Sequence, residues 1–266
     1  MPPESVALTA DVAGADWLRP DWAVQGVGAL MSTRRGGESR GAFDSLNLRH
    51  GLGDEPAAVD ANLRRLRAAL GAEPVWLKQV HGRQVVRLTE RDTRPGAPVH
   101  EADASITTEP GVGCAVQVAD CLPALFAAPE GRAVGAAHAG WRGLSLGVLE
   151  ATLSALCEVA ACSPGEVQVW LGACIGPRCF EVGADVLRAF GASPDDAAPT
   201  HFRPHTEGKW MADLPGLARE RLQRAGVTAI TGGQWCTVEE ASRFFSFRRD
   251  RATGRMAAVV WRHGER

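Results

Sequence analysis

The chain has 266 residues, of which 45% are hydrophobic and 23% charged, so the composition is that of a folded globular protein and excludes disordered and collagen-like classes. Its formal net charge of −2 gives no electrostatic reason to expect a nucleic acid or an anionic membrane as partner. The seven cysteines include no C-x-x-C pair, which fits neither a disulfide framework nor a zinc ribbon. We therefore expect a reduced, cytoplasmic protein whose thiols mostly act as small buried hydrophobes.

No targeting segment or membrane span is expected. The N-terminus carries acids in place of a basic region, and no run approaches the ~18 apolar residues that a span needs. Residues 91–98 and 192–208 are dense in turn-forming residues and are expected to be loops. Since neither separates regions of different composition, we expect one domain over residues 1–266, with 1–20 as an N-terminal extension.

The first half of the chain alternates strand and helix patterns. In the helical segment, Asp54 can cap the N-terminus, Pro56 suits the first turn, and Val59, Leu63 and Leu66 recur at helical spacing. In chain order, the pattern predicts a strand over 22–32, a helix over 55–70, strands over 74–80 and 84–89 paired around His81-Gly82, and strands over 112–118 and 132–137.

The second half continues the alternation. It predicts a helix over 143–161, a strand over 166–172, helices over 183–190 and 214–224, and strands over 226–231, 243–248 and 256–261. Together these elements indicate a mixed α/β (α+β) fold with mixed sheets flanked by helices and more hairpin character than a doubly wound fold. A dinucleotide-binding site is not expected, because the segment GVGALM at 26–31 lacks the third glycine and opens no helix.

Three turns at the ends of predicted strands, two of them with glycines, each present a side chain able to bind a metal. These turns are KQVHG at 78–82, ADCLP at 119–123 and HAGWRG at 138–143, and the side chains are His81, Cys121 and His138. Two imidazoles and one thiolate form a three-ligand set with an open fourth position, which is typical of catalytic zinc. The spacing matches no local ligand motif, so the alternative is that each residue is a hydrogen-bonded histidine or an inert core cysteine.

Two other readings of these residue types are open. Cys121 and His138 fit a cysteine-hydrolase pair whose imidazole is oriented by Asp103 or Asp120. His201 and His205 have the spacing of a helical zinc motif, but Pro204 breaks the helix that such a motif requires, which favours a surface loop.

Basic and glycine-rich segments offer anion-binding groups. They are RRGG at 34–37, SLNL at 45–48 and Arg142, which follows His138. The segment GACIGPRCFEV at 172–182 is either a turn near functional structure or a strand end with buried thiols, so the roles of Cys174 and Cys179 stay open. The segment FFSFRRD at 244–250 is expected to be a strand with core aromatics, and its arginines are a weaker candidate for a pocket lining.

The motifs KQVHG, ADCLP, HAGWRG, GACIGPRCFEVG and FFSFRRD, with FDSLNL at 43–48, occur in an order that resembles the YfiH-type, or laccase-domain, family. That family was first described as multicopper polyphenol oxidases and later as purine nucleoside phosphorylases. The resemblance spans about residues 25–262. Departures from the family pattern include Ala173 for proline, Val118 for threonine and Phe247 for tyrosine, the last of which removes a hydroxyl that could contact substrate.

The resemblance implies a layered α/β fold similar to the catalytic domain of cytotoxic necrotizing factor. It also implies a zinc site, historically assigned to copper, on His81, Cys121 and His138. The implied activity is phosphorolysis of adenosine to adenine and ribose 1-phosphate, with inosine and methylthioadenosine phosphorolysis and adenosine deamination as side activities. Some relatives are instead linked to peptidoglycan-precursor editing, which would be amide hydrolysis. No protein partner is implied.

Candidate roles follow for the remaining groups. Zinc would activate a water for deamination, or orient phosphate or ribose for phosphorolysis. Phosphorolysis also needs cations for the phosphate and stabilisation of the departing purine. The candidates are Arg34, Lys78 and Arg142 for phosphate, Asn47 and Gln79 for substrate hydrogen bonds, and Asp103 or Asp120 as acid or base.

A four-copper oxidase is not expected from this sequence. Such enzymes use many histidines, often as H-x-H pairs, whereas this chain has seven histidines and no H-x-H. Copper binding in vitro by a two-histidine, one-thiolate site is still expected, because copper(II) binds such ligands more tightly than zinc does.

Overall fold

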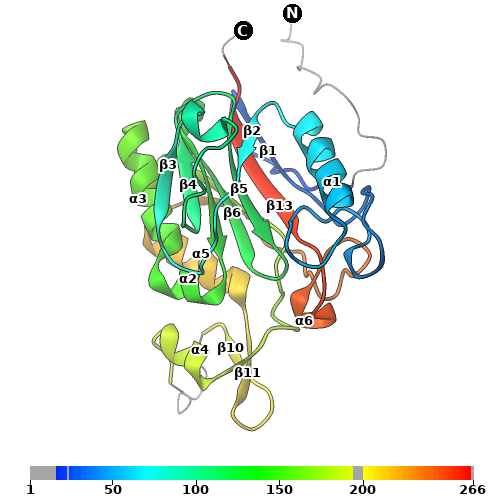
Figure 1. The fold of residues 1–266 in the computed structure, drawn as a ribbon. Helices are drawn as coiled ribbons and strands as arrows, with labels where there is room; N and C mark the ends of the chain where they lie inside the picture. The colour runs from blue at the N-terminus through cyan, green and yellow to red at the C-terminus, as the bar shows by residue number, and fades with distance from the viewer. Residues whose placement is uncertain (1–15, 23, 194–199, 265–266) are drawn as a thin grey trace, which may run out of the picture.

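Two β-sheets pack face to face and helices cover their outer faces, which makes four layers (Figure 1). The computed structural model describes residues 16–22, 24–193 and 200–264. The four-stranded sheet has the order β1 (Val27–Met31), β13 (Met256–Arg262), β5 (Val112–Val118), β2 (Glu73–Val75). The six-stranded sheet has the order β12 (Ala229–Gly232), β8 (Gln168–Leu171), β6 (Leu122–Ala127), β7 (Val134–Ala139), β4 (Ala104–Thr107), β3 (Val85–Leu88). Both sheets mix parallel and antiparallel pairs.

The helices lie on opposite outer faces of the paired sheets (Figure 1). Helix α1 (Pro56–Ala69) covers the four-stranded sheet, and α2 (Trp141–Leu146), α3 (Val148–Ala160) and α5 (Leu214–Arg224) pack with the six-stranded sheet. Short 3-10 turns occur at Gly41–Phe43, Glu90–Thr93, Pro129–Gly131 and Pro164–Glu166. None of the helices in the described ranges is long and apolar enough to cross a membrane.

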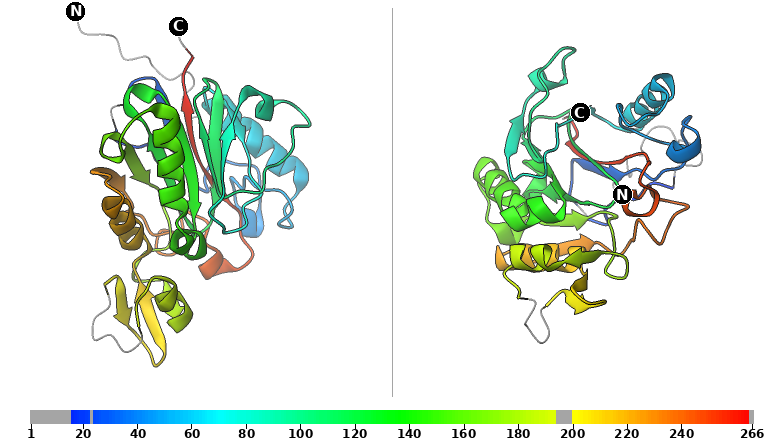
Figure 2. Two further views of the ribbon diagram at one scale, coloured as in Figure 1. Left: turned by 90° about the vertical axis from the view of Figure 1, so that its left-hand side faces the viewer. Right: turned by 60° about the horizontal axis from the view of Figure 1, so that its bottom comes forward.

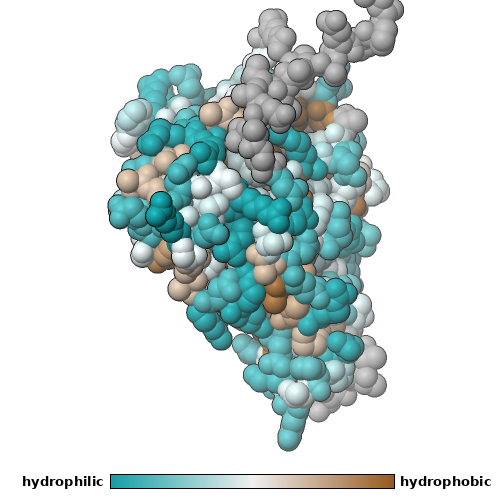
Figure 3. Space-filling view, turned by 90° about the vertical axis from the view of Figure 1, so that its right-hand side faces the viewer, coloured by the Kyte–Doolittle hydropathy of each residue, from teal (hydrophilic) through white to brown (hydrophobic). Residues whose placement is uncertain are grey.

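The apolar content of the strands follows from this layering. Strand β6 is buried along its whole length, because one side of its sheet faces the other sheet and the opposite side faces helices. Leu125 and Trp170 contribute to the core between the sheets, whereas Phe126 and Leu171 contribute to the core under the helices. On the face in Figure 3, hydrophilic residues predominate and apolar residues gather in only a small patch.

Helix boundaries follow local chemistry. Pro56 begins α1, where its missing N–H costs nothing. The Asp213 side chain caps α5 by accepting a hydrogen bond of 2.9 Å from the N–H of Gly216. Gly147, with φ of 93°, separates α2 from α3, since this left-handed conformation ends a helix and favours glycine.

A small lobe projects from one end of the sheets (Figure 2). It contains the antiparallel strands β9 (Glu181–Gly183), β11 (Lys209–Ala212) and β10 (Phe202–Pro204), together with α4 (Ala184–Ala189). The chain enters the lobe through residues 174–180 and leaves it at 213–214. Both connections border the cavity described below.

The structure confirms the α+β class with mixed sheets and flanking helices, and corrects several predicted elements. Segments 74–80 and 84–89 do not pair with each other: β2 pairs with β5, and β3 with β4 in the other sheet. The single helix predicted over 143–161 is two helices. Strands β4, β6, β9, β10 and β11 were not predicted, and β10 lies inside the predicted loop 192–208, of which 194–199 are outside the described residues.

The predicted strand over 243–248 is also wrong. Phe244 and Phe245 are core residues as expected, but the backbone is irregular there and continues into the short helix α6 (Phe247–Asp250). The Ser246 side chain starts this helix by accepting from the N–H of Arg249. Of the predicted N-terminal extension, residues 1–15 lie outside the described residues, whereas Leu18 is buried and bridges Met31.

Phe126→Ala should lower the free energy of unfolding by about 3–5 kcal/mol, because it empties a fully buried site in β6. Val99→Ala is the matched control, since Val99 is 68% exposed, and its effect should stay within about 0.5 kcal/mol. Urea unfolding of both variants measures the difference. Equal effects would contradict the assignment of Phe126 to the core.

Candidate functional site

The structure brings the three predicted ligands together. Cys121 immediately precedes β6, His138 lies in the adjacent β7, and His81 lies on the loop that follows β2. The Sγ of Cys121 is 3.8 Å from Nε2 of His81, and the two imidazole rings stand nearly edge to face at 4.9 Å. The donor atoms of the three residues all lie within 4.8 Å of one another.

A buried carboxylate, Asp103, holds two of these ligands in place. It accepts hydrogen bonds from the backbone N–H groups of Val80 (3.1 Å), His81 (2.9 Å) and Gly82 (2.7 Å), and from Nδ1 of His138 (2.8 Å). Burial would raise the pKa of Asp103, but His138 and the backbone donors hold it below the usual range, so the group is an acceptor. The Nδ1–H of His138 therefore points to Asp103, and Nε2 is the ring nitrogen left for the Cys121 sulfur or for a metal.

The glycines of the motifs allow the ligands to approach closely. A Cβ on Gly140 would lie 2.8 Å from the Cys121 sulfur and 3.0 Å from Cδ2 of His81. His81 itself has φ of 61°, a conformation that non-glycine residues rarely adopt outside functional sites. The three backbone hydrogen bonds to Asp103 stabilise this conformation.

The thiol and the imidazoles influence one another's protonation. Burial alone would raise the pKa of Cys121, but the positive charge of His138 and hydrogen bonds from both histidines lower it to about 6. Burial would lower the pKa of His138, but the Cys121 thiolate and Asp103 raise it to about 9. Near neutral pH the metal-free site therefore holds a thiolate beside an imidazolium.

This donor set fits a zinc-like ion. With Zn–S of ~2.3 Å and Zn–N of ~2.0 Å, tetrahedral ligands lie about 3.5 Å apart, close to the 3.8 Å between Cys121 and His81. The carboxylate behind His138 is the usual outer partner of a ligating imidazole. Three protein donors leave a coordination position for a further ligand.

A cavity of about 360 Å³ opens at the donor set. Its charged lining includes Arg142, Arg248 and Arg251, and its apolar lining is formed by Trp141, Ile175, Phe180, Leu214 and Phe247. The Arg142 guanidinium lies over the Trp141 ring at 4.4 Å, and that of Arg248 over the Phe180 ring at 5.4 Å. The cavity thus combines cationic groups, aromatic faces and metal donors.

Asp120 also lines this cavity, but both of its oxygens are already engaged. Oδ1 accepts from the Thr237 hydroxyl at 2.6 Å, and Oδ2 accepts from the backbone N–H of Arg248 at 2.6 Å. Asp120 has φ of 94°, so its backbone is held in an unusual conformation next to Cys121. Asp120 therefore fixes the start of α6, and with it Phe247 and Arg248, beside the metal donors.

The other predicted substrate residues lie outside the lining of this cavity. Arg34 donates to the carbonyl groups of Asp44 and Ala241 and lines a separate cavity of about 570 Å³. Lys78 forms an exposed ion pair with Glu101 at 2.8 Å.

Asn47 and Gln79 are both engaged within the protein. Asn47 is fully buried, donates to the Asp54 carboxylate and accepts from the N–H of Arg255. Gln79 exchanges two hydrogen bonds with the backbone of Gln117. Substrate contact by Arg34, Asn47, Lys78 or Gln79 stays a prediction.

Sequence reasoning missed Phe180, Leu214 and Arg251 as cavity residues. Phe180 and Leu214 belong to the two connections of the lobe, and no local pattern marks them as neighbours of Cys121.

The structure bears on the two interpretations of His201 and His205, a helical zinc motif or a surface loop. His201 pairs with the carboxylates of Asp213 and Glu220, whereas His205 pairs with that of Glu181. Strand β10 runs between the two histidines, so they do not lie on a helix.

Comparisons with known proteins agree on one family. The sequence pattern of the family described as "Multi-copper polyphenol oxidoreductase laccase" matches residues 28–263. A Pseudomonas aeruginosa protein named purine nucleoside phosphorylase is 49% identical over 247 residues, which cover 92% of this chain and 98% of that protein. An Escherichia coli protein named purine nucleoside phosphorylase YfiH is 49% identical over 249 residues, covering 92% and 96%.

Solved structures agree with this result. A crystal structure of a Neisseria meningitidis protein superposes with a TM-score of 0.85 at 44% identity, covering 93% of this chain and 99% of that one. The crystal structure of YlmD from Geobacillus stearothermophilus gives 0.84 at 34% identity, covering 93% and 96%.

The pKa of Cys121 predicts how the metal-free protein reacts with iodoacetamide. Only the thiolate is alkylated, so the rate at Cys121 should rise with pH and reach half its plateau near pH 6, well below the ordinary thiol value of 9.0. His138→Ala removes the stabilising positive charge and should move the midpoint upward, whereas His50→Ala should not. Peptide mass spectrometry after chelation measures the rate, and a midpoint that His138→Ala leaves unchanged would contradict the ion pair.

Proposed function

Because the chain belongs to the laccase-domain family that includes the YfiH-named relatives, we propose that it is a metal-dependent purine nucleoside phosphorylase. The proposed reaction transfers the ribosyl group of adenosine from adenine to phosphate and yields ribose 1-phosphate. Inosine and methylthioadenosine are proposed as further substrates. The observation that carries this proposal is the His-Cys-His donor set and three arginines around one cavity.

Zinc is the proposed native ion, held by His81, Cys121 and His138. When bound, it would supply Lewis-acid stabilisation of an oxygen of the substrate or phosphate. The protein prepares the site by keeping Cys121 deprotonated and by fixing the His138 ring through Asp103. Asp103 is thus proposed to position the ligands, because all its hydrogen bonds are with the backbone and His138.

The arginines are proposed to bind phosphate. Arg142 and Arg251 lie at the cavity, and Arg248 is anchored through NH1 to the carbonyl of Glu181 at 3.0 Å. A guanidinium donates paired hydrogen bonds that match phosphate oxygens. Held over Trp141 and Phe180, Arg142 and Arg248 lose little conformational freedom when an anion binds.

The aromatic residues are proposed to hold the purine. Phe247 is 48% exposed, unusual for a phenylalanine, and Phe180 contributes a second ring to the same cavity. Flat heteroaromatic bases stack on such rings. The volume of about 360 Å³ lies within the range of small-molecule sites.

Adenosine deamination is proposed as a side activity, since it needs the metal donors but no phosphate. Amide hydrolysis of a cell-wall precursor is the alternative. In support of it, the Cys121 thiol contacts the His138 imidazole, which in turn contacts the Asp103 carboxylate, as in the triad of a cysteine hydrolase. The second imidazole, that of His81, lies 3.8 Å from the thiol and favours a metal site, because a cysteine hydrolase needs only one imidazole.

The polyphenol oxidase alternative has weaker support. Among the seven histidines, all within the described residues, His81 and His138 alone contribute to this donor set. A multicopper cluster needs more imidazoles than that. Copper loading of the same three ligands in vitro stays part of the proposal.

A cytoplasmic location and the absence of a nucleic-acid or protein partner complete the proposal. The seven cysteines are all free thiols, as expected in a reducing compartment. The net charge of −2 provides no attraction to a polyanion.

Adenine release from adenosine by the zinc-loaded protein should increase with phosphate concentration, and Cys121→Ala should reduce turnover by at least about 100-fold together with bound metal. Liquid chromatography of adenine, inosine and ribose 1-phosphate, with metal analysis, gives both readouts. Inosine formation without any phosphate dependence would overturn phosphorolysis. Loss of turnover with full metal retention would favour the cysteine hydrolase.

Arg248→Ala and Arg142→Ala should each raise the KM for phosphate by about 10- to 100-fold, because each removes a charged hydrogen-bond donor worth ~1.5–3 kcal/mol. Arg94→Ala is the control, since Arg94 is exposed and pairs only with Glu90 among the described residues. Initial rates at saturating adenosine and varied phosphate measure the effect. An unchanged KM in both variants would place the phosphate elsewhere.

A further inference from the structure

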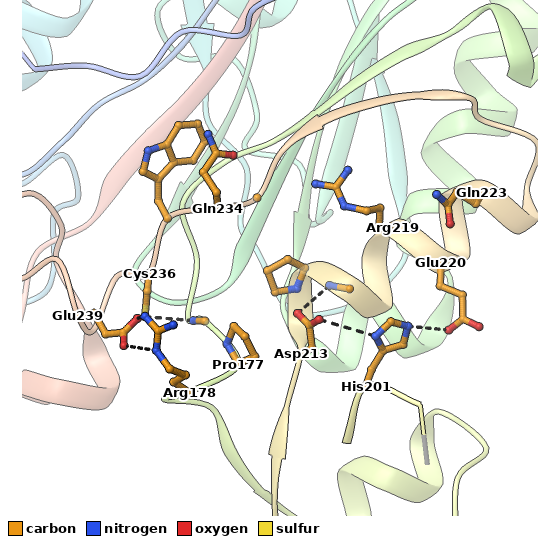
Figure 4. Close-up of a pocket in the computed structure, with 15 residues that line it drawn as sticks. Pro177, Arg178, His201, Asp213, Arg219, Glu220, Gln223, Gln234, Cys236 and Glu239 are labelled. Carbon is orange, nitrogen blue, oxygen red and sulfur yellow. Dashed lines mark hydrogen bonds and ion pairs between the residues drawn. The ribbon is translucent and has the colours of Figure 1, made fainter. Parts of the chain in front are cut away.

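A second set of metal-binding side chains lies outside the catalytic cavity. The donor atoms of Cys179, Cys236 and Glu239 all lie within 4.8 Å of one another. Cys236 and Glu239 line a cavity of about 640 Å³ (Figure 4), which shares no lining residue with the cavity at His81, Cys121 and His138.

The backbone fixes the two cysteines relative to each other. Cys236 pairs in a parallel bridge with Cys174, and the N–H of Thr237 donates to the Cys174 carbonyl at 2.9 Å. On the loop that follows Cys174, the N–H of Cys179 donates to the Gly176 carbonyl at 3.0 Å. These contacts join two segments that are distant in sequence, so the donors are arranged before any ligand binds.

The surroundings of Cys236 and Glu239 resemble the outer partners of metal ligands. The backbone N–H of Gly176 donates to Sγ of Cys236 at 3.3 Å, and a Cβ at Gly176 would lie 3.2 Å from that sulfur. Arg178 donates to both oxygens of Glu239, at 2.8 and 2.9 Å, and so fixes the position of the carboxylate near Cys236 (Figure 4). Ligating thiolates and carboxylates are commonly supported by such hydrogen bonds.

The charges of the cluster also favour a cation. None of the three side chains carries a positive charge, and each of the two thiols can become a thiolate ligand. A divalent cation would replace the two thiol protons and balance the charge of the resulting thiolates.

We propose that Cys179, Cys236 and Glu239 form a second metal site, selective for a divalent ion of borderline softness such as zinc. Two metal–sulfur bonds and one metal–oxygen bond form as the two thiol protons pass to solvent. Two thiolates exclude magnesium and calcium, which prefer oxygen ligands. Because the site lies at the wall of an open cavity, the remaining coordination positions are filled by water.

The site has a structural consequence for the catalytic cavity. Cys179 is followed by Phe180, whose ring lines that cavity, and Gly176 follows Ile175, which also lines it. A metal on Cys179 and Cys236 would tie this loop to the segment after β12 and fix the aromatic wall. The proposal itself does not depend on the reaction that the other cavity performs.

The test is a titration of the reduced, metal-stripped, full-length protein with Co²⁺, followed by the sulfur-to-cobalt charge-transfer band and by metal analysis after desalting. We expect two equivalents in the unmodified protein and one in Cys121→Ala. Cys179→Ser should also bind one equivalent, and Glu239→Gln should weaken the second equivalent by at least about 10-fold. Cys157→Ser, which changes a half-buried cysteine of α3, should still bind two.

The variants keep the test independent of folding and of activity. Glu239 is exposed, so Glu239→Gln preserves the fold even if Cys179→Ser disturbs it, and thermal unfolding checks both. Binding of no cobalt by Cys121→Ala, or of as much cobalt by Cys179→Ser as by the unmodified protein, would overturn the proposal. If the mass of the protein instead falls by 2 Da in air, and the reduced protein binds no second equivalent of cobalt, then Cys179 and Cys236 form a disulfide and not a metal site.

Discussion

The geometry of the His-Cys-His donor set depends on one buried carboxylate. Asp103 accepts three backbone N–H groups from the loop at 80–82 and the Nδ1–H of His138. A buried charge is tolerated only when it is fully hydrogen-bonded, so this carboxylate forces the loop and β7 to approach each other. His81 and His138 reach the same point because both are tied to Asp103.

The sheets and the lobe supply the other walls of the site. The pairing of β6 with β7 places Cys121 next to His138, and Gly140 leaves room for the sulfur that any larger residue would displace. Asp120 holds the start of α6 through the N–H of Arg248. The cations and aromatic rings thus come from the starts of the short helices α2 and α6 and from the connection at 174–180, whereas Cys121 and His138 come from the neighbouring strands β6 and β7 and His81 from the loop after β2.

The segment 174–180 lies between the two donor clusters. One side of it contributes Ile175 and Phe180 to the cavity at Cys121, and the other side contributes Gly176 and Arg178 to the larger cavity at Cys236. Cys174 and Gly176 are consistent with this position: Cys174 is buried beside Cys236, and Gly176 packs so close to Cys236 that a Cβ would lie only 3.2 Å from its sulfur. A ligand on either side therefore acts on the same short stretch of backbone.

The sequence by itself determined the local features. Helical periodicity with Pro56 predicted α1, alternation predicted β5, and the turns at the ends of predicted strands with the family's motif order identified His81, Cys121 and His138. The tertiary structure alone decided which strands pair, that Asn47 is an internal hydrogen-bonding group, and that Cys179 meets Cys236. The physical reason is that propensity and spacing act over a few residues, whereas sheet pairing, burial and the carboxylate of Asp103 join segments that are distant along the chain.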